Sequence, residues 1–421
     1  MNELKTIIHL PKGAVKVPPS KSMAHRAIIC SALAEGESII ENINLSEDIQ
    51  ATLRCVESLG VEYKYKDNVL TIQGGIKLPR EKILLDCGES GSTLRFFIAI
   101  ASIFSTPISL TGSSRLMERP LGPYLEALHK QGVSIDKQGD VLTICGPLKG
   151  GDFFLPGDIS SQFVTGLLLA LPLVKEDSRI ILSGALESKS YVDLTLQVME
   201  HFGVHVKCGN HEQYTISGQQ KYRPQDFSVE GDYSNAAFFL IAGALGREVE
   251  CLGLNEESRQ GDKAILDILK SCGANITKGS EGGIQVTPGD LKAITVDVHD
   301  IPDLVPPLAV LLCFCRGNSR IINAGRLRIK ESDRLHAVTE ELNSLGAKIE
   351  EGPDYLVIQG IQELRGGIVD SHNDHRIAMS VALAAIKSRG EVQLTGASAV
   401  NKSYPGFWED FCKEERRKDH E

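Results

Sequence analysis

Apolar and polar positions follow a pattern that recurs about every 70 residues along the chain. In five segments an apolar helix end is followed by a glycine, a short strand, a turn and a second strand. The first glycines of these segments are Gly60, Gly132, Gly203, Gly273 and Gly346. A glycine directly after a helix suits the left-handed C-terminal position that other residues adopt only at a cost. Alternation such as VLTIQG (69–74) predicts strands with one buried face.

A second series of positions keeps the same period and marks the starts of apolar helices. Its markers are Ser22, Ser92, Ser161, Ser234, Asp303 and His375. The two series together predict six units, each with a strand, a helix, a strand, a second helix and a β-hairpin. The chain is too long for one core, so we expect two α/β domains of three units each. Boundaries near 16–20 and 227–232 give domains of 18–228 and of 1–17 with 229–421.

The first helix of each unit is almost entirely apolar after its first turn. FVTGLLLALPLV (163–174) and RIAMSVALAAI (376–386) are two examples. We therefore expect these helices to be buried, to pack in parallel and to point their N-termini at a common region. Because a helix N-terminus carries partial positive charge and unpaired N–H groups, that region predicts an anion-binding site.

Composition narrows the class of protein. The 421 residues are 42% hydrophobic and carry a net charge of −10, which argues against nucleic acid as the main partner. The start MNELKTIIHLPKG lacks a basic segment followed by an apolar run, so we expect no signal peptide, and the apolar run 304–315 is too short to span a membrane. Ten cysteines without C-x-x-C spacing indicate a reducing cytosol and no zinc site. We expect the charged tail 413–421 to be frayed.

The stretch PSKSMAHR (19–26) places cations where a helix dipole disfavours them. Lys21 and Arg26 lie in the first turns of a predicted helix, with Ser22 between them. Two readings are open. The helix is capped and its cations are solvated, or an anionic ligand binds there.

Other units carry comparable groups near their helix starts, which favours the second reading. They are Gly91 in GESGSTLRF, Arg119 in RLMERPLG, Ser160, Ser161 and Gln162 in SSQF, Lys330, Glu331 and Arg334 in KESDR, Arg376 in NDHR, and Lys402 in KSYP. Asp303 heads the apolar run IPDLVPPLAVLLCF. Local sequence favours Asp303 as a helix cap over a desolvated base with a raised pKa.

At least five cations and two carboxylates are thus gathered at these points. Arginine forks suit phosphate and carboxylate ligands, whereas carboxylates suit proton transfer. The sequence holds no metal-ligand spacing, P-loop or dinucleotide fingerprint. We therefore expect acid–base chemistry without a cofactor or a metal.

Nine ordered motifs between about residues 19 and 405 resemble the EPSP synthase family of enolpyruvyl transferases. They are PSKSMAHR, GESGSTLRF, RLMERPLG, SSQF, VEGDYSNAAFFL, IPD, KESDR, NDHR and KSYP. The resemblance implies an inside-out α/β barrel of two domains, each of three βαβαββ units, around an interdomain cleft that closes on ligands. It also implies transfer of the enolpyruvyl group of phosphoenolpyruvate to the 5-hydroxyl of shikimate 3-phosphate. That reaction belongs to chorismate and aromatic amino-acid biosynthesis, in a cytoplasmic and monomeric enzyme that is a glyphosate target.

The resemblance also implies roles for individual residues. Shikimate 3-phosphate would contact Lys21, Ser22, Arg26, Ser160, Ser161, Gln162, Ser188, Tyr191, Asp303 and Lys330. Phosphoenolpyruvate would contact Lys21, Gly91, Arg119, Gln162, Arg334, Arg376 and Lys402. Catalysis would use Lys21, Asp303 as the base for the 5-hydroxyl proton and Glu331 as the acid that protonates the methylene carbon. This context reverses the local preference for Asp303 as a cap.

Three positions depart from the commonest family pattern. Glu89 stands where many members have Asn, Phe96 where many have Pro, and Arg326 where Asn is frequent. Two rival functions stay open: a related transferase acting on UDP-N-acetylglucosamine, and a non-catalytic protein that binds phosphorylated metabolites. The first usually carries a reactive Cys in the loop before Arg119, and GSSRLMER has none. The second would need the cations but not Asp303 and Glu331 together.

Overall fold

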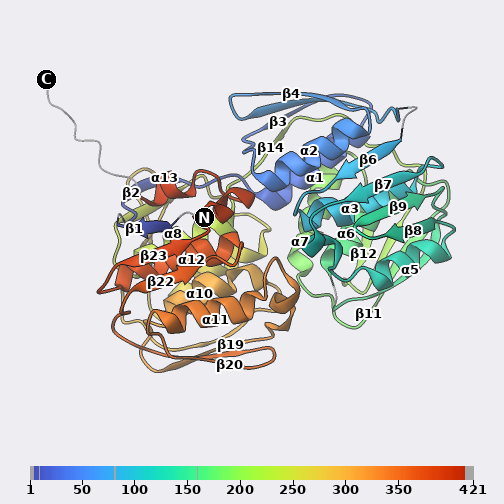
Figure 1. The fold of residues 1–421 in the computed structure, drawn as a ribbon. Helices are drawn as coiled ribbons and strands as arrows, with labels where there is room; N and C mark the ends of the chain where they lie inside the picture. The colour runs from blue at the N-terminus through green and yellow to red at the C-terminus, as the bar shows by residue number, and fades with distance from the viewer. Residues whose placement is uncertain (1–3, 9, 80–81, 159, 413–421) are drawn as a thin grey trace, which may run out of the picture. The chain divides into compact units, whose positions relative to one another are not determined.

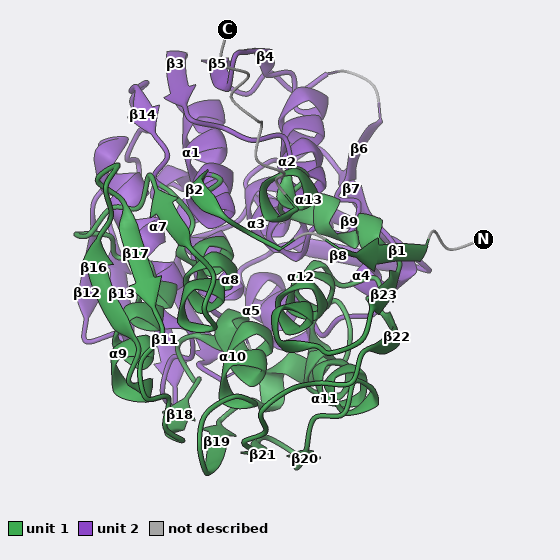
Figure 2. Cartoon of the chain, turned by 90° about the vertical axis from the view of Figure 1, so that its left-hand side faces the viewer, with its two compact units in different colours: residues 1–18, 231–421 green, residues 19–230 purple. Residues whose placement is uncertain are grey.

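The computed structural model describes residues 4–8, 10–79, 82–158 and 160–412. It contains two compact units: unit 1, Met1–Pro18 with Gly231–Glu421, and unit 2, Pro19–Glu230 (Figure 2). The colours of Figure 1 show unit 1 receiving both the first and the last segments of the chain. Two crossings, near residues 18 and 231, therefore connect the units.

Within the described residues, unit 2 holds three four-stranded sheets with one shared topology. Two neighbouring strands run parallel, and an antiparallel hairpin pairs with the second of them. The first sheet contains β14 (Phe227–Ser228), β3 (Gly36–Glu41), β5 (Val69–Gly74) and β4 (Glu62–Lys66). The second contains β6 (Ile83–Asp86), β7 (Ile108–Thr111), β9 (Val141–Cys145) and β8 (Ser134–Gln138). The third contains β10 (Gly151–Pro156), β11 (Ser178–Ser183), β13 (Gln213–Ile216) and β12 (Val206–Gly209).

The helices of unit 2 fall into two kinds. The buried ones are α1 (Lys21–Leu33), α3 (Gly91–Ser102) and α6 (Ser161–Ala170). The amphipathic ones are α2 (Glu47–Ser58), α5 (Gly122–Lys130) and α7 (Lys189–His201), with the short α4 (Ser114–Met117) and η1 (Leu171–Leu173) between them. Ser20, Ser90 and Ser160 cap α1, α3 and α6 through their hydroxyl oxygens. The buried helices therefore start at defined points, with their N–H groups directed at those hydroxyls.

Unit 1 repeats the topology with strands from both ends of the chain. One sheet contains β2 (Gly13–Lys16), β15 (Val249–Leu252), β17 (Ile284–Thr287) and β16 (Asn275–Lys278). Another contains β18 (Thr295–Asp297), β19 (Asn318–Ile322), β21 (Leu356–Gln359) and β20 (Ile349–Glu351). In the third, β22 (Gly367–Asp370) runs parallel to β23 (Val392–Thr395), and β1 (Leu4–Ile7) pairs antiparallel with β23. The N-terminal strand thus occupies the place that a hairpin strand has in the other sheets.

The helices of unit 1 follow the same division. The buried ones are α8 (Tyr233–Ala244), α10 (Val305–Leu312) and α12 (His375–Ala384). The others are α9 (Ile265–Cys272), α11 (Arg334–Ser344) and α13 (Phe407–Phe411). Short 3₁₀ turns are η2 (Gly261–Ala264), η3 (Pro302–Leu304), η4 (Gly325–Ile329), η5 (Ala385–Lys387) and η6 (Ala397–Lys402). Helices α8, α10 and α12 pack against one another and form the core of the unit.

The periodic sequence signals are confirmed where they specify local geometry. The six buried helices begin within two residues of the predicted markers. The glycines that follow the second helices all have left-handed backbone, with φ between +79° and +102°, at Gly60, Gly132, Gly203, Gly273 and Gly346. A side chain at these points would strain the backbone, which explains why glycine recurs there.

One sequence prediction is wrong in detail, and one feature was not predicted. That feature is the pairing of β2, the strand before α1, with β15 of the fourth unit, while β14 pairs with β3. The sixth unit receives β1 where a hairpin was predicted. Periodicity marks where strands lie, but it does not say which sheet each strand joins, because pairing depends on contacts far apart in sequence. The tail 413–421 lies outside the described residues.

Candidate functional site

The start of α1 carries the first cluster of polar groups in unit 2. The Lys21 Nζ lies 2.6 Å from Asp48 Oδ2 on α2. Arg26 is 2% exposed, and its guanidinium donates to the backbone oxygens of Ser22 (2.6 Å) and Tyr191 (2.9 Å). Burial lowers the pKa of Arg26 to about 10, so it stays charged at neutral pH. The cluster joins α1 to α7 around a fixed positive charge.

A second cluster lies where α3 and α6 begin. The Gln162 amide donates from Nε2 to Ser92 Oγ (2.9 Å), and its Oε1 accepts from Arg95 NH1 (2.8 Å). A Cβ added to Gly91 would lie 2.7 Å from Arg95 NH1 and 2.9 Å from Arg119 NH1. Two guanidinium groups therefore approach the bare backbone of Gly91, an arrangement suited to an anion.

Within the part of the chain that the structure describes, Arg119 in this cluster has a nitrogen that lacks a hydrogen bond. The buried Nε of Arg119 has no acceptor among the described residues. A buried guanidinium N–H without an acceptor carries a desolvation cost that a bound carboxylate or phosphate would remove. Arg119 is therefore suited to receive an anion.

The serine and tyrosine candidates of unit 2 lie at the neighbouring helix starts. Ser160 caps α6, and Ser161 is its buried first residue. Ser188 precedes α7 with left-handed backbone at φ 55°, and Tyr191 follows in the first turn of that helix. All four thus lie at or beside helix N-termini, a placement that the sequence predicted for Ser160 and Ser161, and Tyr191 joins the Arg26 cluster through its carbonyl oxygen.

Asp303 is the centre of the polar cluster in unit 1. Its Oδ1 lies 3.0 Å from Arg334 NH1 and 3.8 Å from Lys330 Nζ, and its Oδ2 lies 3.1 Å from Arg376 NH2. No described side chain caps α10, which begins at Val305, so the local prediction of a cap is wrong. Asp303 forms ion pairs with these cations instead.

The pKa of Asp303 also differs from the second local alternative, a desolvated base with a raised pKa. Burial acts to raise the pKa of Asp303, but Arg376, Lys330 and Arg334 outweigh it and bring that pKa well below its usual range. A carboxylate between cations keeps its negative charge because the charged form is stabilised. Asp303 is thus ionised, and its two oxygens are held by arginines.

Arg334 links the carboxylates of this cluster. It is 1% exposed, and its three nitrogens reach Asp303 (3.0 Å), Glu331 (2.7 Å) and Asp374 (2.8 Å). Burial acts to lower the pKa of Arg334, but Asp374, Glu331 and Asp303 raise it above its usual value. Asp374 also caps α12 by accepting from the backbone N–H of Arg376 at 2.9 Å. Arg334 is therefore held in one orientation by three carboxylates.

Two further groups near Asp303 have shifted pKa values. Burial lowers the pKa of Lys330 to about 8. Burial and the neighbouring charge of Asp303 raise the pKa of Asp262 to about 7, and the Ser234 hydroxyl is hydrogen-bonded to Asp262. Both groups change charge close to neutral pH, which is common in functional sites.

Each unit brings together a subset of the predicted residues. Unit 2 gathers Lys21, Ser22, Arg26, Gly91, Arg119, Ser160, Ser161, Gln162, Ser188 and Tyr191 near the starts of α1, α3, α6 and α7. Unit 1 gathers Asp303, Lys330, Glu331, Arg334 and Arg376 through ion pairs. Lys402 ends η6 and donates to the Asn373 carbonyl oxygen (2.6 Å), next to Asp374. The sequence had predicted Lys330 and Glu331 in the first turn of α11, but the helix begins at Arg334 and both residues precede it.

Four polar residues of these clusters were not predicted. They are Asp48, Arg95, Asp262 and Asp374. Arg95 had a visible signal, because a lone arginine in the apolar helix GSTLRFFIAIAS needs a partner. Asp48, Asp262 and Asp374 resemble ordinary helix-start carboxylates in sequence, so only their contacts single them out.

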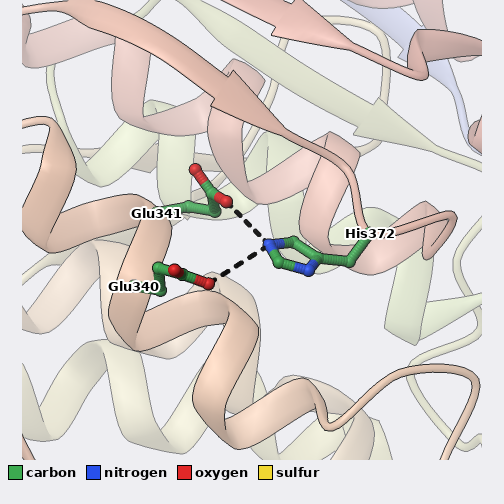
Figure 3. A group of neighbouring side chains, drawn as sticks. All are labelled: Glu340, Glu341 and His372. Carbon is green, nitrogen blue, oxygen red and sulfur yellow. Dashed lines mark hydrogen bonds and ion pairs between the residues drawn. The ribbon is translucent and has the colours of Figure 1, made fainter. Parts of the chain in front are cut away.

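The part of the chain described by the structure also limits other classes of site. It contains no helix that combines the length and the apolar character needed to cross a membrane. A compact group of histidine and carboxylate ligand atoms is formed by Glu340, Glu341 and His372 (Figure 3). This group does not include Asp303 or any of its ion-pair partners.

Comparisons with known proteins agree with this arrangement. The family model of EPSP synthase (3-phosphoshikimate 1-carboxyvinyltransferase) matches residues 6–411. Proteins named 3-phosphoshikimate 1-carboxyvinyltransferase are similar to this chain: one from Clostridium perfringens is 49% identical over 97% of this chain and 98% of its own, and one from Clostridium kluyveri is 47% identical over 95% and 94%.

Solved structures extend the comparison to the fold. An EPSP synthase from Acinetobacter baumannii aligns with a TM-score of 0.81 and 26% identity over 97% of each chain. The enolpyruvyl transferase NikO from Streptomyces tendae aligns with a TM-score of 0.80 over 98% of this chain and 97% of its own, at 17% identity, and supports the fold alone. The predicted two-domain enolpyruvyl-transferase fold is confirmed.

Proposed function

Because the chain belongs to the EPSP synthase family, we propose that it transfers the enolpyruvyl group of phosphoenolpyruvate to the 5-hydroxyl of shikimate 3-phosphate. The products are 5-enolpyruvylshikimate 3-phosphate and phosphate. The reaction is a step of the shikimate pathway to chorismate and the aromatic amino acids. The observation that carries this proposal is the joint presence of family membership and an ionised, cation-bound Asp303 next to Glu331.

The family resemblance divides the residues between the two ligands. We assign shikimate 3-phosphate to Ser22, Arg26, Ser160, Ser161, Gln162, Ser188, Tyr191 and Lys330. We assign phosphoenolpyruvate to Lys21, Gly91, Arg119, Gln162, Arg334, Arg376 and Lys402. The buried Arg26 and the unpaired Nε of Arg119 support these assignments, because Arg26 holds a fixed positive charge in α1 and Arg119 lies against Gly91 at the start of α3. Since cations for phosphoenolpyruvate come from both units, we propose that the reaction takes place in a cleft that the units close around their ligands.

Ligand binding gives Asp303 the freedom to act as a base. In the structure its oxygens contact Arg334, Arg376 and Lys330, which lower its basicity. The carboxylate and phosphate of phosphoenolpyruvate compete for Arg334 and Arg376, and each arginine contact they take raises the proton affinity of Asp303.

The proton transfers then follow from position and charge. Asp303 accepts the 5-hydroxyl proton as the hydroxyl oxygen bonds to the central carbon of phosphoenolpyruvate. Glu331, held by Arg334 at 2.7 Å, donates a proton to the methylene carbon. Loss of phosphate and of a methyl proton then gives the enolpyruvyl product. The remaining proposals for this chain are a monomeric state and a cytoplasmic location.

Phosphate release with matched acceptors tests the proposed function. Shikimate 3-phosphate with phosphoenolpyruvate should release phosphate, whereas UDP-N-acetylglucosamine with phosphoenolpyruvate should not. Release with the nucleotide sugar alone would transfer the assignment to the related transferase. Binding of shikimate 3-phosphate and phosphoenolpyruvate, with no phosphate release in the presence of either acceptor, would indicate a non-catalytic binding protein.

A further inference from the structure

A compact group of three ligand side chains lies outside the charge cluster around Asp303. Glu340 and Glu341 are neighbours on α11, and His372 lies in the turn between β22 and α12 (Figure 3). The His372 Nε2 lies 2.6 Å from Glu341 Oε1 and 3.8 Å from Glu340 Oε2. Figure 3 shows both carboxylates directed at the same imidazole nitrogen. Two separate elements therefore bring three donor atoms within 4.8 Å of one another.

The burial of Glu341 indicates that this point needs positive charge. Its side chain is only 9% exposed, and the cationic group that the structure places against it is the imidazole of His372. A buried carboxylate is costly unless a cation or sufficient donors compensate it. A protonated His372 supplies at most one positive charge to two carboxylates, and a neutral His372 supplies none. A dication at the shared point would neutralise both.

The donor set and its spacing fit a divalent transition metal. Imidazole nitrogen with carboxylate oxygen is a donor combination that zinc accepts, whereas calcium and magnesium prefer oxygen alone. Tetrahedral ligands at about 2.1 Å from zinc lie about 3.4 Å from one another. The separations of His372 Nε2 from the two carboxylates, 2.6 and 3.8 Å, lie on either side of that value, and all three donor atoms lie within 4.8 Å of one another. Small side-chain rotations would therefore open a site.

We propose that Glu340, Glu341 and His372 form a binding site for a divalent transition-metal ion such as Zn²⁺, with water completing the coordination. The ion would connect α11 to the turn before α12. Helix α11 begins with Arg334, and Asp374 lies two residues after His372. The site would thus brace the two segments whose side chains form the buried Arg334–Asp374 pair.

Metal binding to the full-length, untagged protein tests the proposal without substrates. After treatment with a chelator and its removal, Co²⁺ should bind in a 1:1 ratio with visible ligand-field absorption, and Zn²⁺ should displace it. Zn²⁺ should also raise the unfolding temperature, because it binds the folded state. His372→Gln and Glu340→Gln should each weaken Co²⁺ binding at least about tenfold, the lower limit seen for loss of outer-shell partners of metal sites.

Two comparisons keep the test decisive. His205→Gln removes an exposed histidine in unit 2 and should bind Co²⁺ like the parent protein. Glu340 is half exposed, so Glu340→Gln should fold even where His372→Gln does not. The proposal is overturned when the parent protein binds neither ion, or when Glu340→Gln binds Co²⁺ as tightly as the parent. It is also overturned when His205→Gln alone abolishes binding.

Discussion

Asp374 offers a sharp measure of how much the buried charge network stabilises unit 1. It is fully buried, it accepts from Arg334 Nε at 2.8 Å and it caps α12 through the Arg376 N–H. Asp374→Asn preserves size and capping ability but removes the charge. Removing one partner of a buried ion pair costs about 3–5 kcal/mol. Because Arg334 retains Asp303 and Glu331, we expect the lower end, about 3 kcal/mol.

The chain carries a convenient reporter for this measurement. Trp408 is the single tryptophan of the sequence and lies on α13 in unit 1, so its fluorescence follows the unfolding of that unit in urea. Asp290→Asn is a matched control, because Asp290 pairs with Arg316 at the surface. Exposed pairs of that kind contribute about 0–1 kcal/mol. A midpoint shift for Asp374→Asn no larger than for Asp290→Asn would refute the reasoning.

The effect of Asp374→Asn should also depend on pH in a definite direction. Burial acts to raise the pKa of Asp374, but Arg334 and His375 lower it below the ordinary value. A carboxyl whose pKa is lowered by folding stabilises the protein above its unfolded pKa and loses that contribution as pH falls. The stability difference between parent and variant should therefore narrow below about pH 4. A constant difference down to acid pH would contradict this origin.

Three further perturbations have defined outcomes. Folding raises the pKa of Asp262 to about 7, so the contribution of this group to stability falls as pH rises from about 4 through 7. In Asp262→Asn, urea midpoints taken across that range should no longer show this fall. Lys330, with its pKa lowered to about 8, should lose charge above that pH and raise the KM for shikimate 3-phosphate, whereas Lys330→Arg should keep that KM flat. Gly91→Ala would bring a methyl group against Arg95 and Arg119 and should weaken phosphoenolpyruvate by about 1–3 kcal/mol, with a larger loss for the longer glyphosate molecule, measured as the ratio of inhibition constant to KM.

The sequence predicted local geometry well because helix starts and left-handed glycines depend on neighbours along the chain. The glycine at 273, for example, has φ +99° directly after α9. Which sheet each strand joins was not predictable in the same way. β2 and β14 carry ordinary strand patterns, and their pairing with β15 and β3 depends on the path of the whole chain.

The electrostatic state of the site was the least predictable part. An aspartate before an apolar helix suggested either a cap or a raised pKa, and the structure gives neither for Asp303. The deciding groups, Arg334 and Arg376, lie 31 and 73 residues away in sequence. The Glu341–His372 contact also joins residues 31 apart, so no short ligand motif could have signalled it.

Turnover of Asp303→Asn compared with the parent enzyme tests the central claim most directly. The variant should fold and should still bind shikimate 3-phosphate, while phosphate release from phosphoenolpyruvate falls by about two or more orders of magnitude. Asp300→Asn, which changes a partly exposed carboxylate paired with His299, should release phosphate at the parent rate. Near-normal phosphate release by Asp303→Asn would contradict the role of Asp303 as the base.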